Sequence, residues 1–201
     1  MRVTFIGDSI TDAGRDRTDP GSFGDGYVSL LAPGLTAGGA IVRNLGIAGN
    51  RVADLAARWD DELMPTAPEL LTVYVGINEV WRRFDSDDPT PTAVFEETYR
   101  RLLRRAAEAH APKLILMEPY LLPVRAEQEG WLDELAEKRA AVARLAAEFG
   151  AAHVPLHDVL TAAAEGRDPA ELAPDGVHPT PAGSRLIADT WTAASGISDS
   201  R

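Results

Sequence analysis

The stretch Val3-Thr4-Phe5-Ile6-Gly7-Asp8-Ser9-Ile10 joins a short apolar run to a glycine and a serine near the start of the chain. In α/β proteins, a strand that ends in a tight turn places a side chain at the carboxyl edge of the sheet, where ligands bind. Gly7 allows such a turn, and Ser9 would then stand exposed as a nucleophile. The same residues also fit an ordinary loop in which Ser9 caps a helix. A base, an orienting carboxylate and oxyanion donors elsewhere in the chain would favour the first interpretation.

Length and composition indicate a single globular domain. The chain has 201 residues, 45% of them hydrophobic and 25% charged, which is typical of a protein with a full core. We expect one domain over residues 1–201, with a disordered tail of about six residues at its C-terminus. The net charge of −11 disfavours nucleic acids and anionic membranes as partners. Four arginines between residues 100 and 105 lie beside glutamates in a helical pattern, which indicates an ion-paired face.

Thiol and metal chemistry have little support in the sequence. The chain contains no cysteine, which excludes disulfides, thiolate metal sites and a cysteine nucleophile. His110, His153 and His157 have structural interpretations, and no pair of histidines has ligand spacing on a helix. We therefore expect no metal and no cofactor.

The first residues enter a strand directly, without the pattern of a leader peptide. No stretch approaches the about 18 apolar residues of a membrane span. These features favour a cytoplasmic protein.

Short apolar runs alternate with helical patterns along the whole chain. This alternation, with strands apolar on both faces, predicts a three-layer α/β/α sandwich around a mostly parallel five-stranded sheet. Polar residues 85–91 and the long connection 119–130 are expected to line a site. The predicted strands are 3–6, 40–44, 70–75, 113–117 and 152–154, and the predicted helices lie near 26–31, 52–64, 93–110, 131–149 and 181–194.

Asp175-Gly176-Val177-His178 is the strongest chemical signal in the sequence. An aspartate and a histidine three residues apart in a glycine-containing turn can pair, so that the carboxylate accepts the Nδ1 hydrogen of the imidazole. The ring is then held in the tautomer whose Nε2 can take a proton from a serine.

Two loops after predicted strands are candidates for an oxyanion hole. Gly49 leaves a backbone N–H open to close approach, and Asn78 can direct its amide at a developing oxyanion. Each also has a plainer interpretation, Gly49 as a simple turn and Asn78 as a helix cap.

Taken together and in order, these segments resemble the four conserved blocks of the SGNH (GDSL-type) hydrolases, and the resemblance extends from Phe5 to about residue 187. It implies a flavodoxin-like sheet and a serine hydrolase without a cofactor. It also implies Ser9 as nucleophile, Asp175 and His178 as its acid–base pair, and an oxyanion hole made by Ser9 N–H, Gly49 N–H and the Asn78 side chain. The matching blocks are Gly7-Asp8-Ser9, Ile47-Ala48-Gly49-Asn50, Gly76-Ile77-Asn78 and Asp175-Gly176-Val177-His178. The third block departs from the family in carrying Glu79 where an aspartate is usual, which puts the placement of Asn78 in doubt.

The residues around the blocks are similar to those of intracellular SGNH acetylesterases that act on xylo-oligosaccharides. The resemblance implies a small-molecule acetyl ester as substrate, with Asp8, Trp81 and Arg82 as candidate substrate-binding residues. Trp81 can equally anchor the core, and Arg82 can equally form a surface ion pair. Homo-oligomerisation is left open, with Trp59 and Trp131 either in an interface or in the core.

Other activities fit the same segments. A lysophospholipase, a thioesterase or a broad-specificity arylesterase would use the same nucleophile and base. Two further alternatives are a catalytically silent carbohydrate-binding protein of this fold and an unrelated α/β domain with coincidental matches. Each would require all four blocks to be present in a protein that does not use them for catalysis.

Overall fold

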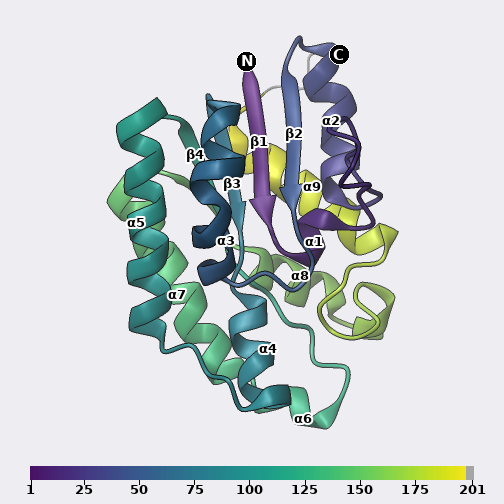
Figure 1. Cartoon of the computed structure of the whole chain (residues 1–201). Helices are drawn as coiled ribbons and strands as arrows, with labels where there is room; N and C mark the ends of the chain where they lie inside the picture. Colours follow the sequence, from purple (N-terminus) through teal and green to yellow (C-terminus); the bar gives the residue numbers. More distant parts are fainter. Residues whose placement is uncertain (198–201) are drawn as a thin grey trace.

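A five-stranded parallel sheet forms the centre of the computed structural model, which describes residues 1–197 (Figure 1). The strand order is β2-β1-β3-β4-β5, which confirms the predicted three-layer fold. All five predicted strands are present, with ends that differ from the expected ones by two residues or fewer. Their bounds are β1 Arg2–Gly7, β2 Ile41–Gly46, β3 Leu70–Tyr74, β4 Lys113–Met117 and β5 Ala152–Val154.

Helices cover both faces of the sheet, and some of them were not expected. The sequence does not predict three of them, which are α4 (Ile77–Ser86), α6 (Ala126–Glu129) and α8 (Leu156–Ala164). The predicted helix 52–64 is divided, because α3 is followed by a π-helical turn (Trp59–Leu63) and a 3-10 turn (Met64–Thr66). The helices are α1 Ser9–Asp12, α2 Tyr27–Ala37, α3 Val52–Arg58, α4 Ile77–Ser86, α5 Thr92–His110, α6 Ala126–Glu129, α7 Leu132–Phe149, α8 Leu156–Ala164 and α9 Pro181–Ser195.

The sheet separates two hydrophobic cores. On one face, Phe5 and Trp191 belong to a core covered by α2, α8 and α9. On the other face, Ile6 and Tyr99 belong to a core covered by α3, α5 and α7. Alternate residues of β1 thus point into different cores, as expected for a parallel strand covered on both sides.

Trp59 and Trp131, whose place the sequence left open, are both buried, with exposures of 1% and 6%. They therefore belong to the packed interior of the protein. The expected C-terminal tail falls mostly on residues 198–201, which lie outside the described residues.

The arrangement of the central strands determines where a site can form. The chain runs outward from β1 to β2 and then returns to β3 on the other side of β1, so the strand order reverses between β1 and β3. Such a switch point opens a crevice at the carboxyl ends of the strands. Gly7 pairs with Gly46 on one side and with Tyr74 on the other, so the ends of these three strands lie at one level.

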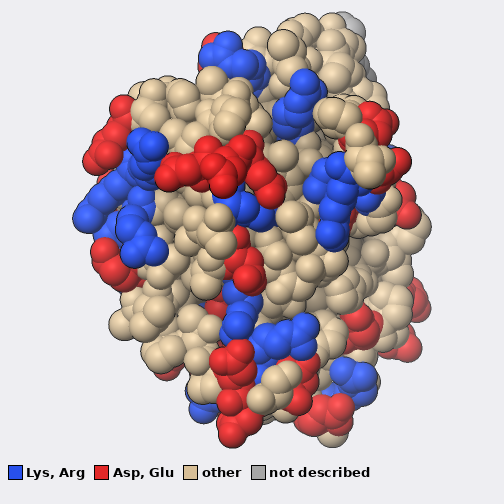
Figure 2. All heavy atoms as spheres, in the orientation of Figure 1, with Lys and Arg blue, Asp and Glu red and all other residues tan. Residues whose placement is uncertain are grey.

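Charged side chains of both signs are mixed on the face shown in Figure 2. Arg100 pairs with Glu96, Glu97 and Glu148, so the arginines of α5 lie in an ion-paired surface, as expected. Among residues 1–197, no helix combines the length and apolar character needed to cross a bilayer.

Candidate active site

Ser9 is the first residue of α1 and follows β1 after a single residue, Asp8. A side chain at Gly7 would overlap the Tyr74 carbonyl oxygen, so only glycine lets β1 end this close to β3. The helix cap is Asp8, which accepts a hydrogen bond from the Ile10 N–H at 3.1 Å. Ser9 is thus not the cap, and its side chain is half-buried at the edge of the sheet.

Asp175 and His178 are folded together by a tight turn. Asp175 Oδ1 accepts hydrogen bonds from the backbone N–H groups of Val177 (2.9 Å) and His178 (2.7 Å). Gly176 has a φ of 86°, and a side chain there would come within 2.6 Å of the Leu122 carbonyl oxygen. The turn therefore requires glycine, and it places the carboxylate beside the histidine ring.

The three side chains form one continuous chain of hydrogen bonds. His178 Nδ1 donates to Asp175 Oδ2 at 2.6 Å, and Ser9 Oγ donates to His178 Nε2 at 2.9 Å. We call this arrangement the Ser9–His178–Asp175 relay. It brings together residues separated by 169 positions in the sequence.

The environment of Asp175 favours its ionised form. Partial burial raises the pKa of this carboxyl, but the hydrogen bonds from the His178 ring and from the His178 and Val177 N–H groups outweigh burial. The pKa of Asp175 therefore lies below its usual value, and a carboxylate faces Nδ1. Such a carboxylate fixes the ring tautomer and stabilises an imidazolium.

The sequence-predicted donors Gly49 and Asn78 follow β2 and β3, the two strands that flank β1. Gly49 is exposed in the loop after β2 with a φ of 82°, and Asn78 lies in the first turn of α4, after β3. Asn78 Nδ2 donates one hydrogen to the Asn50 carbonyl at 3.0 Å. An amide carries two N–H hydrogens, so this bond uses one of the two hydrogens of Asn78. As the first residue of α1, Ser9 has a backbone N–H without an intrahelical acceptor.

Glu79 links the start of α4, which carries Asn78, to the segment that follows Gly49. Its Oε1 accepts a hydrogen bond of 2.6 Å from the Val52 N–H at the start of α3. Burial raises the pKa of the Glu79 carboxyl to about 7. The glutamate that departs from the family pattern thus supports the loop after β2 through its longer side chain.

The three candidate substrate-binding residues have different positions. Asp8 is fully buried, its Oδ2 has no partner, and burial raises its pKa to about 7, so its side chain does not face solvent. Arg82 forms an ion pair with Asp85 on the surface of α4. Trp81 is half-buried, and its ring centre lies 5.9 Å from that of His178. Only Trp81 therefore lies against the relay.

Two residues behind the relay carry no local sequence signal of a role in the site. Tyr120 Oη donates to the Val177 carbonyl at 2.5 Å, and Gln128 Nε2 donates to the Asp175 carbonyl at 2.7 Å. Both are buried in the connection 119–130, which the sequence identified only as a candidate site-lining loop. What distinguishes these two polar side chains is their burial, and burial depends on the fold rather than on the local sequence.

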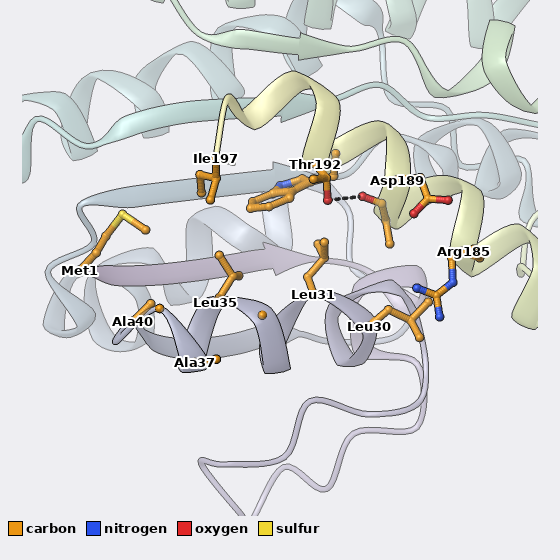
Figure 3. A pocket seen from close by; sticks show the side chains of 14 residues that line it. Met1, Leu30, Leu31, Leu35, Ala37, Ala40, Arg185, Asp189, Thr192 and Ile197 are labelled. Atoms are coloured by element: carbon orange, nitrogen blue, oxygen red, sulfur yellow. Dashed lines mark hydrogen bonds between the residues drawn. The ribbon is translucent and has the colours of Figure 1, made fainter. Parts of the chain in front are cut away.

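Two cavities of similar size differ in their relation to the relay. One of about 340 Å³ is lined by Ser9 and His178 themselves. The other, of about 300 Å³, lies between α2 and α9, with Met1 and Ile197 at one end and Arg185 and Asp189 at the other (Figure 3). None of the relay residues lines the second cavity. Within residues 1–197, no cluster of three or more histidine, aspartate or glutamate side chains is arranged to hold a metal ion.

Comparison with known proteins places this geometry in a family. The GDSL-like lipase/acylhydrolase family matches residues 5–186. An acetylxylan esterase of Geobacillus stearothermophilus is 33% identical over 198 residues, which are 93% of this chain and 90% of that enzyme. The crystal structure of Axe2, an acetylxylan esterase of the same organism, covers 100% of this chain and 96% of its own, with a TM-score of 0.90 and 31% identity. An α/β hydrolase from the metagenome of Lake Arreo, Spain, covers 97% of this chain and 94% of its own, with a TM-score of 0.88 and 33% identity. The chain therefore belongs to the GDSL-like lipase/acylhydrolase family and is a carboxylic ester hydrolase with the SGNH hydrolase fold.

Proposed function

We propose that the protein is a serine esterase that removes acetyl groups from xylo-oligosaccharides or related carbohydrates, with Ser9 as nucleophile. The observation that carries the proposal is the Ser9–His178–Asp175 relay, with hydrogen bonds of 2.9 and 2.6 Å in the order that nucleophilic catalysis requires. The relay joins residues of the first and the fourth of the sequence blocks, which supports the chemistry that the resemblance implies.

Acylation begins when Ser9 Oγ attacks the carbonyl carbon of the ester while His178 Nε2 removes the hydroxyl proton. The carbon–oxygen double bond opens, and its electron pair becomes the oxyanion of a tetrahedral intermediate. Asp175 stabilises the imidazolium that forms. His178 then protonates the leaving alcohol as its bond to carbon breaks, which leaves an acetyl group on Ser9. A water molecule repeats the sequence and releases acetate.

The developing oxyanion needs hydrogen-bond donors that are in place before the reaction. We assign this role to the N–H groups of Ser9 and Gly49 and to the Asn78 amide. Removal of one such donor in other serine hydrolases costs roughly 3–4 kcal/mol of transition-state stabilisation. The contacts of Asn78 and Glu79 with the loop after β2 support the assignment, since they hold the donors in fixed positions.

Similarity to acetylxylan esterases supports the choice of substrate. Variants of the Geobacillus enzyme described as catalytic mutants replace a serine, an aspartate or a histidine by alanine, and these are the three residue types of the relay. Trp81 beside His178 offers an aromatic surface to a sugar ring. Arg82, engaged with Asp85, is left out of the proposed binding site.

Activity assays on a series of substrates test the proposal. We expect hydrolysis of acetylated xylo-oligosaccharides, and a fall in activity from p-nitrophenyl acetate to the octanoate and the palmitate. Ser9→Ala should abolish turnover, whereas Ser86→Ala, an exposed serine at the end of α4, should leave it unchanged.

Three outcomes would contradict the proposal. Unchanged turnover by Ser9→Ala would remove Ser9 as nucleophile. Fastest turnover of the palmitate would favour a lysophospholipase or thioesterase. Binding of xylo-oligosaccharides without any hydrolysis of their acetyl esters would favour a catalytically silent carbohydrate-binding protein.

A further inference from the structure

The cavity beside Ser9 and His178 is a candidate subsite for the substrate. Its wall is formed by α1 and the two residues that follow it, by the turn at Asp25 and Gly26, and by the start of α9. Neither Gly49 nor Asn78 lines it. Its volume of about 340 Å³ is within the range of small-molecule sites and far larger than a methyl group requires. We call it the α1–α9 groove.

The turn that contains Asp25 packs so tightly on α1 that its neighbours must be glycine. The Asp25 N–H donates to the Ala13 carbonyl at 2.8 Å. A side chain at Gly24 would overlap that same carbonyl oxygen, and one at Gly26 would come within 2.6 Å of Ala13 Cβ. Asp25 is therefore the one residue of this turn that can present a side chain to the groove.

Asp25 is an exposed residue, and its carboxylate lies beside Gly14. An ideal Cβ at Gly14 would lie 3.5 Å from Oδ1 and 3.6 Å from Oδ2, so the absence of a side chain there leaves room above the carboxylate. Across residues 1–197, Asp25 makes no side-chain hydrogen bond or ion pair. The nearby Arg15 and Arg17 both face Asp12 instead.

Asp25 is also the only aspartate, glutamate, lysine or arginine among the described residues that line the groove. This carboxylate is therefore the direct acidic contact that the groove offers to a substrate. A carboxylate accepts hydrogen bonds at both oxygens, which suits a pair of neighbouring hydroxyl groups. It disfavours a substrate group that is itself anionic, because like charges repel.

We propose that the α1–α9 groove is the subsite for the alcohol part of the ester, and that Asp25 selects polyhydroxylated, uncharged alcohols. The inference rests on the proposed function and deepens it. His178 lines the groove and would protonate the leaving oxygen, so the alcohol lies on the side of the relay where the groove begins. The hydroxyl groups of the sugar then donate to the Asp25 carboxylate.

Three substrates separate this role from a general effect on catalysis. Phenyl acetate is neutral and carries no hydroxyl group, 4-acetoxybenzoate adds an anionic group to it, and acetylated xylobiose adds hydroxyl groups. The measured quantities are the ratios of kcat/KM between substrates, because a ratio cancels any loss of folded protein. The variants are Asp25→Ala and Asp25→Asn, with Asp61→Asn as the control, an exposed acid of the π-helical turn outside the groove.

We expect Asp25→Ala to lower the ratio of acetylated xylobiose to phenyl acetate about tenfold, mainly through KM, the size of effect expected for a lost hydrogen bond to a charged group. It should raise the ratio of 4-acetoxybenzoate to phenyl acetate several-fold. Asp25→Asn keeps a hydrogen-bond acceptor, so its ratio of acetylated xylobiose to phenyl acetate should lie between those of Asp25→Ala and the wild type. Because the negative charge is lost, its ratio of 4-acetoxybenzoate to phenyl acetate should rise as in Asp25→Ala. Asp61→Asn should leave both ratios as in the wild type.

The inference is overturned if Asp25→Ala leaves either ratio unchanged. Its failure can be told apart from failure of the proposed function. If the wild-type enzyme hydrolyses phenyl acetate but no acetylated sugar, the carbohydrate function is wrong. In that case glycerol monoacetate replaces xylobiose as the polyhydroxylated substrate, and the same two ratios decide the role of Asp25.

Discussion

The Glu79 carboxylate holds the Val52 N–H at 2.6 Å, while the adjacent Asn78 amide donates to the Asn50 carbonyl at 3.0 Å. Two consecutive residues of α4 thus hold the chain on both sides of Arg51. The loop that carries Gly49 is thereby tied to Asn78, so the two proposed oxyanion donors cannot move independently. The glutamate that stands in place of the usual aspartate makes the contact with Val52 in this chain.

Replacement of Glu79 by alanine should lower kcat for p-nitrophenyl acetate by about tenfold to a hundredfold, with a smaller change in KM. The Val52 N–H loses its acceptor, and a displacement of about 1 Å in a catalytic group is enough for an effect of this size. Glu79→Gln keeps an oxygen acceptor and should stay within a few-fold of the wild type. A folded Glu79→Ala protein with wild-type kcat would show that the hydrogen bond from Val52 to Glu79 does not position the proposed oxyanion donors.

Stability should decrease as the pH rises from about 4 to about 7. Burial raises the pKa of both Asp8 and Glu79 to about 7, whereas the same groups in the unfolded chain lose their protons near pH 4. Between these values the folded protein binds more protons than the unfolded chain, so its free energy of unfolding falls with rising pH. We expect a loss on the order of 3 kcal/mol for each carboxyl, measured by urea denaturation across this range.

The variant Asp8→Asn removes one of the two titrating groups and should flatten this pH dependence by about half. Asp61→Asn removes an exposed acid and should leave the slope unchanged. If Asp8→Asn keeps the full slope, the buried carboxyl is not its cause.

Much of the fold follows from the sequence because strand patterns are local. All five strands were predicted, since each is a short apolar run between helical patterns. Helix α4 was not predicted, although Ile77, Val80 and Trp81 have helical spacing, because the motif around Asn78 was interpreted as a loop after a strand. Helix α8 follows the three-residue strand β5 almost directly, and so brief a strand gives no clear boundary for the helix.

In the candidate site too, contacts between residues close in sequence can be predicted, and contacts between distant residues cannot. The hydrogen bonds of Asp175 with Val177 and His178 span two or three residues, so the sequence predicts that pair directly. The contact between Gln128 and Asp175 spans 47 positions and depends on how the connection after β4 folds back. Asp8 could not be placed either, because its burial depends on residues of other strands and helices that pack around it.

Gln128 and Tyr120 lie behind the relay. Their contributions to the free energy of unfolding should increase with the number of buried polar groups to which each forms a hydrogen bond. Gln128 donates to the Asp175 carbonyl and accepts from the Val124 and Arg125 N–H groups, whereas Tyr120 Oη makes one hydrogen bond. Gln128→Leu should therefore lower the free energy of unfolding by about 2–3 kcal/mol, and Tyr120→Phe by about 1 kcal/mol. Because Gln128 supports the Asp175 turn, its variant should also lower kcat.

These effects are measured by urea denaturation and by kcat for p-nitrophenyl acetate. Equal losses of stability in the two variants would show that the number of satisfied groups does not decide the effect. An unchanged kcat in Gln128→Leu would separate this residue from the relay.

Lys138 should stabilise the protein far more than an ion pair on the surface does. Its side chain is fully buried, and its Nζ donates to the Thr90 carbonyl (2.8 Å), Thr92 Oγ1 (2.8 Å) and Glu134 Oε1 (2.7 Å). Lys138→Met keeps the length of the side chain but leaves these acceptors without their donor. We expect a loss of about 3 kcal/mol in the free energy of unfolding, because removal of one partner leaves the other polar groups buried and unpaired.

The matched comparison is Arg144→Met, which removes the exposed partner of Glu96. Water screens that pair, so its loss should cost about 1 kcal/mol or less. Within residues 1–197, Arg144 forms no hydrogen bond or ion pair with the Ser9–His178–Asp175 relay or with Glu79, so Arg144→Met should keep the kcat of the wild type at temperatures where it is folded. Equal destabilisation of the two proteins in urea would mean that burial of the Lys138 ammonium does not determine its contribution.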